Sequence, residues 1–488
     1  MSEDFDLRRA LALLRQHDGQ LIETNEPVDP MAELAGVYRY VGAGGTVERP
    51  TKEGPAMIFN QVQGFPDTRV LIGLLASRTR VGLLLGQRPE RLGFLLNEAV
   101  KHPIDAITEE MPSSPAQEVV HLASEANFDI RQLVAAPTNT EEDAGPYITM
   151  GLVLGSDPEG KKMDVTIHRL CLQSKDEISM YIVPGGRHLG AFFEQYEALN
   201  RPMPVTINIG LDPAIEIGAC FEPPTTPLGY NELGVAGALR GQAVRLVKAL
   251  TVPQKVIAGA EFVIEGELLP HVRVREDQHT LTGKAMPEFP GYTGPAQSQV
   301  PIIKVKAVTH RRHPIMQTVI GPSEEHVNLA GIPTEASILQ MIERAMPGKV
   351  LNVYAHPSGG GKYMAVIQFK KSVPSDEGRQ RQAALLAFSA FSELKHIILV
   401  DEDVDIFDTN DVLWALNTRY QANLDTVMIP GVHCHPLDPT QHPAYHPSIM
   451  ADAVSTKAIF DCTVPFAQKD RFKRAHFMDV KNWERFLK

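Results

Sequence analysis

The sequence predicts an α/β plus β chain, in which an α/β region is followed by a β-barrel-like middle domain and a second α/β domain. Three observations lead to this prediction. The chain has 488 residues, of which 43% are apolar, enough to bury a large core in two or three domains. Short apolar segments broken by Gly and Pro crowd residues 146–312, as they do in barrels and sandwiches. Helical and strand-like patterns alternate on both sides of that stretch. We therefore place the N-terminal α/β region at 1–120, the barrel at 121–315 and the C-terminal α/β domain at 316–488.

The N-terminal region opens with an amphipathic pattern. Residues 6–17 predict a short helix that ends at Asp18-Gly19, a typical C-terminal stop. Two apolar runs, 56–59 and 70–72, predict short buried strands. Residues 135–140 predict a linker-like turn.

The remaining elements change in type along the chain. In the middle part, a short strand is predicted over 262–264 and a half-buried strand over 302–308, where apolar residues partly alternate. The elements predicted for the last third are a helix over 334–345, strands over 350–355 and 364–369, a helix over 379–394 and a strand over 397–400.

Composition narrows the class of protein. A net charge of −12 argues against nucleic-acid binding, which needs a basic excess. No apolar run approaches the roughly 20 residues that span a bilayer, and the first residues lack the basic and long apolar parts of a signal peptide. The four cysteines, without a Cys-x-x-Cys pair, favour a reducing compartment. We expect an acidic cytoplasmic enzyme with no membrane partner.

One acid, one imidazole and a second acid form a candidate metal site. Asp164 opens the run DVTIHR, His188 follows Arg187, and Glu232 lies in YNELG. This donor set suits Mn²⁺ or Mg²⁺. The planar fork of Arg169 suits a phosphate or carboxylate, which together with the metal indicates a phosphorylated cofactor held through an ion. Asp, Glu and His are common, so the spacing alone also fits unrelated surface residues.

Longer motifs identify the family that the chain resembles. The chain is similar to the UbiD-like decarboxylases that depend on prenylated FMN, with the nearest resemblance to gallate and protocatechuate decarboxylases. The matching stretches span nearly the whole chain, and they include AELAGVYRYVGAGGTVERPT, APTNTEEDAGPY, DVTIHRL, TINIGLDPAIEIGACFEPPTTPLGYNELGVAGALR, GKAMPEFPGY, GPSEEHVNLAGIPTEASIL and ILVDEDVDIFDTNDVLWALNTR.

The resemblance implies a fold and a cofactor. The middle domain would be a split β-barrel that binds the flavin, with the flavin phosphate on a divalent metal. The family's metal positions match Asp164, His188 and Glu232; some relatives have Asn at the first, where Asp still supplies an oxygen. The residues placed near the flavin are Ile167, His168, Arg169 and Arg187, and the backbone carbonyls placed around a monovalent cation such as K⁺ belong to Val165, Gly218, Ala219 and Phe221.

The resemblance also assigns catalytic roles. Arg169 would hold the substrate carboxylate or an adjacent acid. Glu288 would deliver the proton that replaces CO₂, and its setting between prolines and apolar residues suits a raised pKa. Many relatives carry a second glutamate where this chain has Gly283, and Glu276 is a candidate to replace it.

Three basic residues match positions that contact phenol hydroxyls: His326, Lys362 and His435. Histidine or lysine can accept or steady the proton of a hydroxyl para to the leaving carboxylate. The histidines around His435 also resemble a zinc site, but their Pro-rich spacing provides no rigid element for the ligands.

These assignments predict a reversible, non-oxidative decarboxylase of hydroxylated benzoic acids. Gallate to pyrogallol is the favoured reaction, and protocatechuate to catechol is the alternative. A metal-dependent hydrolase that needs no flavin, or a non-catalytic binding protein with the same fold, are different classes of function. The family further implies a flavin prenyltransferase that supplies the cofactor, and a homodimer or larger assembly built with a terminal oligomerisation segment.

Overall fold

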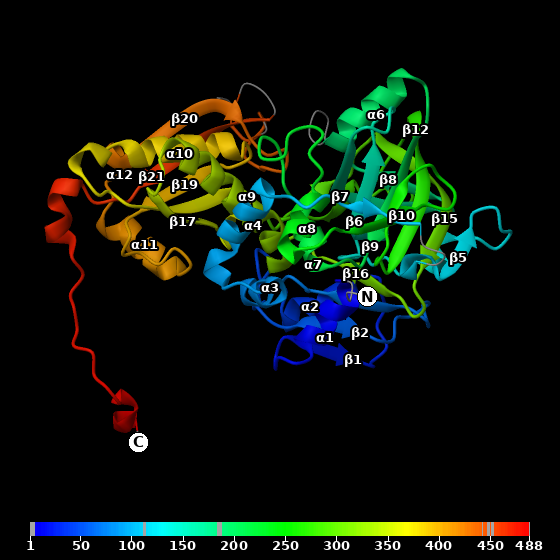
Figure 1. Cartoon of the computed structure of the whole chain (residues 1–488), viewed down its shortest axis with the longest axis horizontal. Helices are drawn as coiled ribbons and strands as arrows, with labels where there is room; N and C mark the ends of the chain where they lie inside the picture. Colours follow the sequence, from blue (N-terminus) through cyan, green and yellow to red (C-terminus); the bar gives the residue numbers. More distant parts are fainter. Residues whose placement is uncertain are drawn as a thin grey trace.

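The computed structural model describes residues 5–110, 114–182, 188–441, 443–446, 449 and 453–487. A strand-rich part and a C-terminal α/β part lie at opposite ends of the molecule, and the N-terminal elements lie beneath the strand-rich part (Figure 1). The predicted fold class is confirmed. None of the helices in the described ranges is long and apolar enough to cross a membrane.

The N-terminal elements form a mixed sheet with strand order β1-β2-β3-β16. Its strands are β1 Leu21–Thr24, β2 Ala56–Phe59, β3 Arg69–Ile72 and, from much later in the chain, β16 Ile315–Thr318. The helices of this region are α1 Leu7–Leu14, α2 Glu33–Val41, α3 Arg78–Leu85 and α4 Leu92–Lys101. Both predicted strands are confirmed.

Two N-terminal predictions need correction. The first helix ends at Leu14 rather than near Asp18, because its buried apolar face ends there and the chain then turns through 3₁₀-type bonds such as that from His17 N to Leu14 O (3.1 Å). Residues 135–140 are not a linker, since Ala135 and Thr138 are buried and Thr138 N donates to Pro30 O (3.1 Å).

The middle of the chain forms a closed six-stranded barrel. Its strand order is β12-β9-β6-β7-β8-β15, and pairing of β15 with β12 closes the ring. The barrel strands are β6 Tyr147–Ser156, β7 Met163–Ser174, β8 Glu177–Met180, β9 Met203–Ile209, β12 Phe262–Val274 and β15 Val300–His310, and β5 Val119–Leu122 extends β15. The strand predicted over 262–264 is therefore far too short, because β12 continues past a register shift at Gly266 and pairs on both edges.

Short helices, a small sheet and a hairpin surround the barrel. The helices are α5 Ile130–Leu133, α6 His188–Ala198, α7 Pro213–Gly218 and α8 Leu233–Arg240. The small sheet has the order β11-β10-β4, with β4 Ile107–Thr108, β10 Arg245–Lys248 and β11 Lys255–Ile257. The hairpin joins β13 Lys284–Pro287 to β14 Thr293–Pro295, and its turn carries Glu288.

The C-terminal part is a five-stranded sheet with order β17-β18-β19-β21-β20. Its strands are β17 Val350–Ala355, β18 Met364–Phe369, β19 His396–Val400, β20 Thr426–His433 and β21 Val454–Asp461. Its helices are α9 Glu324–Ala345, α10 Arg379–Ala390, α11 Thr409–Thr418 and α12 Ala422–Asp425. The predicted strands are confirmed, whereas α10 ends before 394 because Phe391 takes an extended conformation.

Helix α9 begins ten residues earlier than predicted. The prediction placed the start after Pro333, which lacks an N–H and usually marks the first turn. In the structure Pro333 lies inside the helix, and the Thr334 hydroxyl donates to Ala330 O (2.9 Å). The extra turns bring His326 to the start of α9, beside the barrel.

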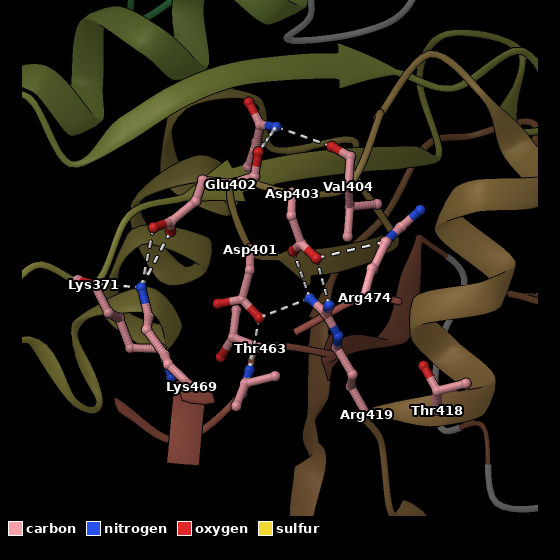
Figure 2. A network of polar contacts seen from close by, with 12 residues as sticks. Lys371, Asp401, Glu402, Asp403, Val404, Thr418, Arg419, Thr463, Lys469 and Arg474 are labelled. Carbon is pink, nitrogen blue, oxygen red and sulfur yellow. Dashed lines mark hydrogen bonds and ion pairs between the residues drawn. The ribbon is translucent and has the colours of Figure 1, made fainter. Parts of the chain in front are cut away.

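Just after β21 the chain is bound to the C-terminal part, and it then leaves the body of the molecule (Figure 1). A network of ion pairs and hydrogen bonds holds the segment that follows β21 (Figure 2). Arg419 donates to Asp401 (3.1 Å) and Asp403 (2.8 and 2.6 Å), Val464 N donates to Asp401 (2.8 Å), and Lys469 contacts Glu402 (3.1 Å). Residues 475–487 then expose large apolar side chains, including Phe477 and Met478.

Candidate active site

Strand β7 carries four residues of the predicted site. Asp164, Ile167, His168 and Arg169 all belong to this strand, and the last three line one cavity. Asp164 and His168 are buried, and His168 Nδ1 lies 3.1 Å from Tyr181 O. The run DVTIHR therefore places the predicted metal ligand Asp164 and the predicted anion-binding residue Arg169 on one strand.

Asp164, His188 and Glu232 lie together. Each offers a ligand atom within 4.8 Å of the other two, and among the described residues they form the one such group of three or more His, Cys, Asp or Glu side chains. His188 begins α6, and Glu232 immediately precedes α8. Leu189 N donates to Asp164 Oδ2 (2.9 Å), which fixes the start of α6 against β7. Two buried carboxylates and an imidazole are a chemically suitable set for Mn²⁺ or Mg²⁺.

Arg169 lies between two glutamates. Its Nη2 donates to Glu276 Oε2 (2.8 Å), its Nε lies 2.8 Å from Glu276 Oε1, and its Nη1 donates to Glu288 Oε1 (2.5 Å). Glu276 also accepts from Tyr147 Oη (3.0 Å) and Gln297 N (3.0 Å). Glu276, which is itself held by Tyr147 and Gln297, thus fixes Arg169. Arg169 also contacts Glu288 in the turn of the hairpin.

Burial and charge act in opposite directions on Glu288. Its burial raises its pKa above the ordinary value of a glutamate, although the Arg169 guanidinium opposes that shift. Although burial acts to lower it, the pKa of Arg169 is raised by the carboxylates of Glu288 and Glu276, so its positive charge is permanent. The raised pKa favours the protonated form of Glu288 up to a higher pH than for an ordinary glutamate.

The opposite wall is basic and aromatic. His326 lies in the first turn of α9, Lys362 in the loop before β18, and His435 just after β20. The ring of Phe289, the residue after Glu288, lies 5.6 Å from the His326 ring and 4.7 Å from the His435 ring, and Lys362 Nζ lies 5.7 Å from it. One aromatic ring therefore contacts all three predicted hydroxyl-binding residues.

A cavity of about 180 Å³ separates the two walls. Ile167, His168 and Arg169 line it from β7, and Glu288 lines it from the hairpin. The residues that line it from the other side include His326, Leu329, Ala330, Lys362 and Phe391. The structure therefore brings residues predicted for the flavin, the proton and the hydroxyls around one space.

Some predicted residues are not assembled there. Arg187 lies outside the described residues. Gly283 is exposed just before the hairpin, and Glu276 contacts Arg169, so its substitution for the second family glutamate stays a prediction. The four carbonyls proposed for K⁺ belong to β7, to the end of α7 and to the loop after it, and that cation stays a prediction.

The sequence did not reveal three residues near the predicted bases. Glu222 lines the cavity 3.8 Å from Lys362 Nζ, Phe289 forms the aromatic contacts, and Glu393 lies beside Lys362 and His435. Phe289 lies in the motif MPEFPGY directly after Glu288, so the sequence offered a signal that this aromatic residue belongs to the site. For Glu393 no local pattern exists, because its partners come from distant loops.

Three family models together cover most of the chain. Residues 12–100 match the 3-octaprenyl-4-hydroxybenzoate carboxy-lyase N-terminal domain, 109–324 match its Rift-related domain, and 327–462 match its C-terminal domain, all under the name UbiD. The chain belongs to the UbiD family. This UbiD-family chain is also 60% identical over 487 residues to gallate decarboxylase from Lactiplantibacillus plantarum, covering 100% of this chain and 99% of the relative.

Solved structures of UbiD-family proteins resemble it over almost the full length. The apo structure of a 3,4-dihydroxybenzoic acid decarboxylase from Enterobacter cloacae has a TM-score of 0.95 at 58% identity and covers 99% of both chains. An evolved dimeric form of the UbiD-class enzyme HmfF from Pelotomaculum thermopropionicum, in complex with prFMN, has a TM-score of 0.83 at 32% identity and covers 99% of this chain and 98% of that one.

Proposed function

We propose that this UbiD-family chain catalyses the reversible, non-oxidative decarboxylation of hydroxylated benzoic acids. Gallate to pyrogallol is the favoured reaction, and protocatechuate to catechol is the second. The observation that carries the proposal is one cavity with Arg169 and Glu288 on one wall and His326 and Lys362 on the other. An arginine for a carboxylate therefore faces bases for ring hydroxyls across a space lined largely by apolar groups.

Asp164, His188 and Glu232 would hold a divalent ion and, through it, the phosphate of prFMN. The metal set adjoins the N-termini of α6 and α8, whose positive ends favour an anion there. When bound, prFMN supplies the electron sink that amino-acid side chains lack. Ile167, His168 and Arg187 would border the flavin, and the carbonyls of Val165, Gly218, Ala219 and Phe221 would hold K⁺.

Arg169 and Glu288 would act on the reacting carbon. The guanidinium orients the substrate carboxylate by a bidentate contact and neutralises its charge in a buried setting. The C–C bond to the carboxylate breaks, CO₂ leaves, and the proton of Glu288 is transferred to the same ring carbon. Glu276 keeps Arg169 in place throughout, since its own contacts with Tyr147 and Gln297 are independent of the substrate.

The basic wall would recognise the hydroxyls. His326, Lys362 and His435 converge on Phe289, the residue after Glu288. A base that withdraws the proton of a hydroxyl para to the carboxylate pushes electrons into the ring and eases loss of CO₂. Three basic side chains suit the three adjacent hydroxyls of gallate, and the 60% identity to a gallate decarboxylase agrees with that order of substrates.

Two partners belong to the same proposal. A flavin prenyltransferase supplies the cofactor. Residues 475–487 pack against a second copy of the chain, because Phe477, Met478 and Phe486 are largely exposed beyond the firmly held segment that follows β21.

Anaerobic turnover tests the function. The protein is purified with and without co-expression of a flavin prenyltransferase and assayed on gallate and protocatechuate. Activity only after co-expression, with gallate preferred, is the expected result. Equal activity in both preparations would instead support a metal-dependent hydrolase, and no activity with flavin bound would overturn the choice of substrates.

A further inference from the structure

Glu393 lies behind the basic wall of the cavity. It belongs to the loop between α10 and β19. Its Oε2 accepts a hydrogen bond from Lys362 Nζ (3.1 Å), and the same oxygen lies 3.4 Å from His435 Nε2. One carboxylate oxygen therefore gathers two of the three predicted hydroxyl-binding groups.

Three separate segments meet at this oxygen. Lys362 precedes β18, His435 follows β20, and Glu393 follows α10, so the sheet of the C-terminal part brings together residues far apart in the chain. Lys362 and His435 are each 8% exposed. An ammonium group at such depth is costly unless acids compensate it, and Glu393 lies nearer to Lys362 Nζ (3.1 Å) than Glu222 does (3.8 Å).

Phe289 restricts the same two side chains from another direction. Its ring packs edge-on against the His435 ring at 4.7 Å, and Lys362 Nζ lies 5.7 Å from the ring centre. A lysine has a long flexible stem and binds weakly when it must first be ordered. Held by Glu393 and packed against Phe289, Lys362 is ordered before a ligand arrives.

We propose that Glu393 is a positioning residue that holds Lys362 and His435 as a pair for two neighbouring hydroxyls of the substrate ring. The pair makes the site select ortho-dihydroxylated rings over rings with a single hydroxyl. This inference rests on the proposed function, because it assigns the hydroxyls of that substrate to the two side chains. Glu393 itself contacts the bases rather than the ring.

Calorimetric binding of catechol and phenol to the purified holoenzyme tests the pairing without turnover. We expect the wild-type protein to bind catechol at least tenfold more tightly than phenol. In Glu393→Gln, which keeps the shape of the side chain and removes its charge, the preference should fall below threefold. Glu393→Asp, which keeps the charge on a shorter stem, should restore part of it.

Glu402→Gln is the matched control, because Glu402 also pairs with a lysine of the C-terminal part, Lys469 (Figure 2), and neither residue lines the cavity. It should retain the full preference, and an unchanged thermal midpoint should establish that each variant is folded. A Glu393→Gln protein that still prefers catechol, or a wild-type protein without a preference, would overturn the pairing. Failure of the decarboxylation itself would appear separately, as absent turnover beside intact catechol selectivity.

Discussion

The two walls of the cavity are built in different ways. The barrel wall takes Arg169 from a long strand and anchors it through Glu276, whose other partners are Tyr147 and Gln297. The opposite wall takes its bases from a helix start and two loops, and holds them by aromatic packing and one shared carboxylate. The register of β7 fixes the position of Arg169, whereas the loops before β18 and after β20 determine the positions of Lys362 and His435.

This difference separates chemistry from recognition. Arg169 lies on a barrel strand, and Glu288 lies in a hairpin turn where its carboxylate contacts Arg169. The loops of the opposite wall can vary without disturbing the barrel. Substitutions on the barrel wall should therefore lower the rate for every substrate. Substitutions on the opposite wall should mainly change which ring is accepted, with a smaller loss of rate where a base no longer withdraws the para-hydroxyl proton.

The largest effect is expected on the barrel wall, at Glu288. Glu288→Gln should lower kcat by about 10²–10⁴-fold, because the variant cannot donate a proton to the ring carbon. The loss should be equal for gallate and protocatechuate. Steady-state rates with flavin content measured in parallel would check it, and a loss confined to one substrate would place Glu288 in recognition instead.

The pH profile gives the corresponding control. A raised pKa keeps Glu288 protonated to higher pH than an ordinary glutamate, so kcat should persist up to that pKa and fall as the pH rises through it. Glu288→Gln should lack this decline. Glu276→Gln, in the same arginine network, should keep the decline and lose less rate, since it holds Arg169 without donating a proton.

Removing the metal should be the next largest effect, and it should act on the barrel wall alone. Dialysis against a chelator should release flavin, because Asp164 and Glu232 would repel a phosphate once no cation lies between them, and the turnover rate should fall in proportion to the flavin lost. Mn²⁺ with fresh cofactor should restore the rate. The affinity for catechol, measured before and after dialysis, should change little. A parallel loss of catechol affinity would mean that the two walls depend on each other.

The fold was predictable where local pattern decides it. The apolar runs of β2, β17 and β18 are bounded by Gly, Pro or polar residues, and their limits follow from the sequence. Local pattern failed at Pro333 and at β12. Helix α9 continues through Pro333, which local pattern treats as a helix start, and the pairing on both edges of β12 is a tertiary feature that outweighs the local signal.

The site was predictable to the extent that it lies in continuous motifs. DVTIHR and MPEFPGY contain Asp164, Arg169 and Glu288. The structure places Asp164 in the candidate metal group and brings Arg169 into contact with Glu288. Glu393 could not be found, since its two contacts cross from one loop to others and leave no spacing to detect. The catalytic roles of Arg169 and Glu288 stay predictions, and the Glu288 and Glu276 variants test them.

A smaller and selective effect is expected for Lys362. Lys362→Met should raise KM for gallate and protocatechuate by about 10–100-fold, the value of one or two hydrogen bonds to a charged group, and change kcat less. Lys395→Met is the matched control, because Lys395 is also partly buried and paired with an acid, Asp438, outside the cavity. An equal fall in kcat with unchanged KM would place Lys362 in the chemical step.

The smallest effect should be that of Phe289→Leu, which touches both walls. The ring packs beside His326 and His435, its backbone carbonyl accepts from Thr46 Oγ1 (2.7 Å), and the residue follows Glu288 directly. Loss of the ring contacts should cost about 0.5–1.5 kcal/mol, or roughly a two- to tenfold rise in KM, with the pH decline of Glu288 unchanged. Phe369→Leu, a core substitution in β18, is the control: it should lower the thermal midpoint as Phe289→Leu does, but leave KM unchanged. A shifted pH decline in Phe289→Leu would instead mean that the recognition wall also sets the position of the proton donor, and that the two walls act as one.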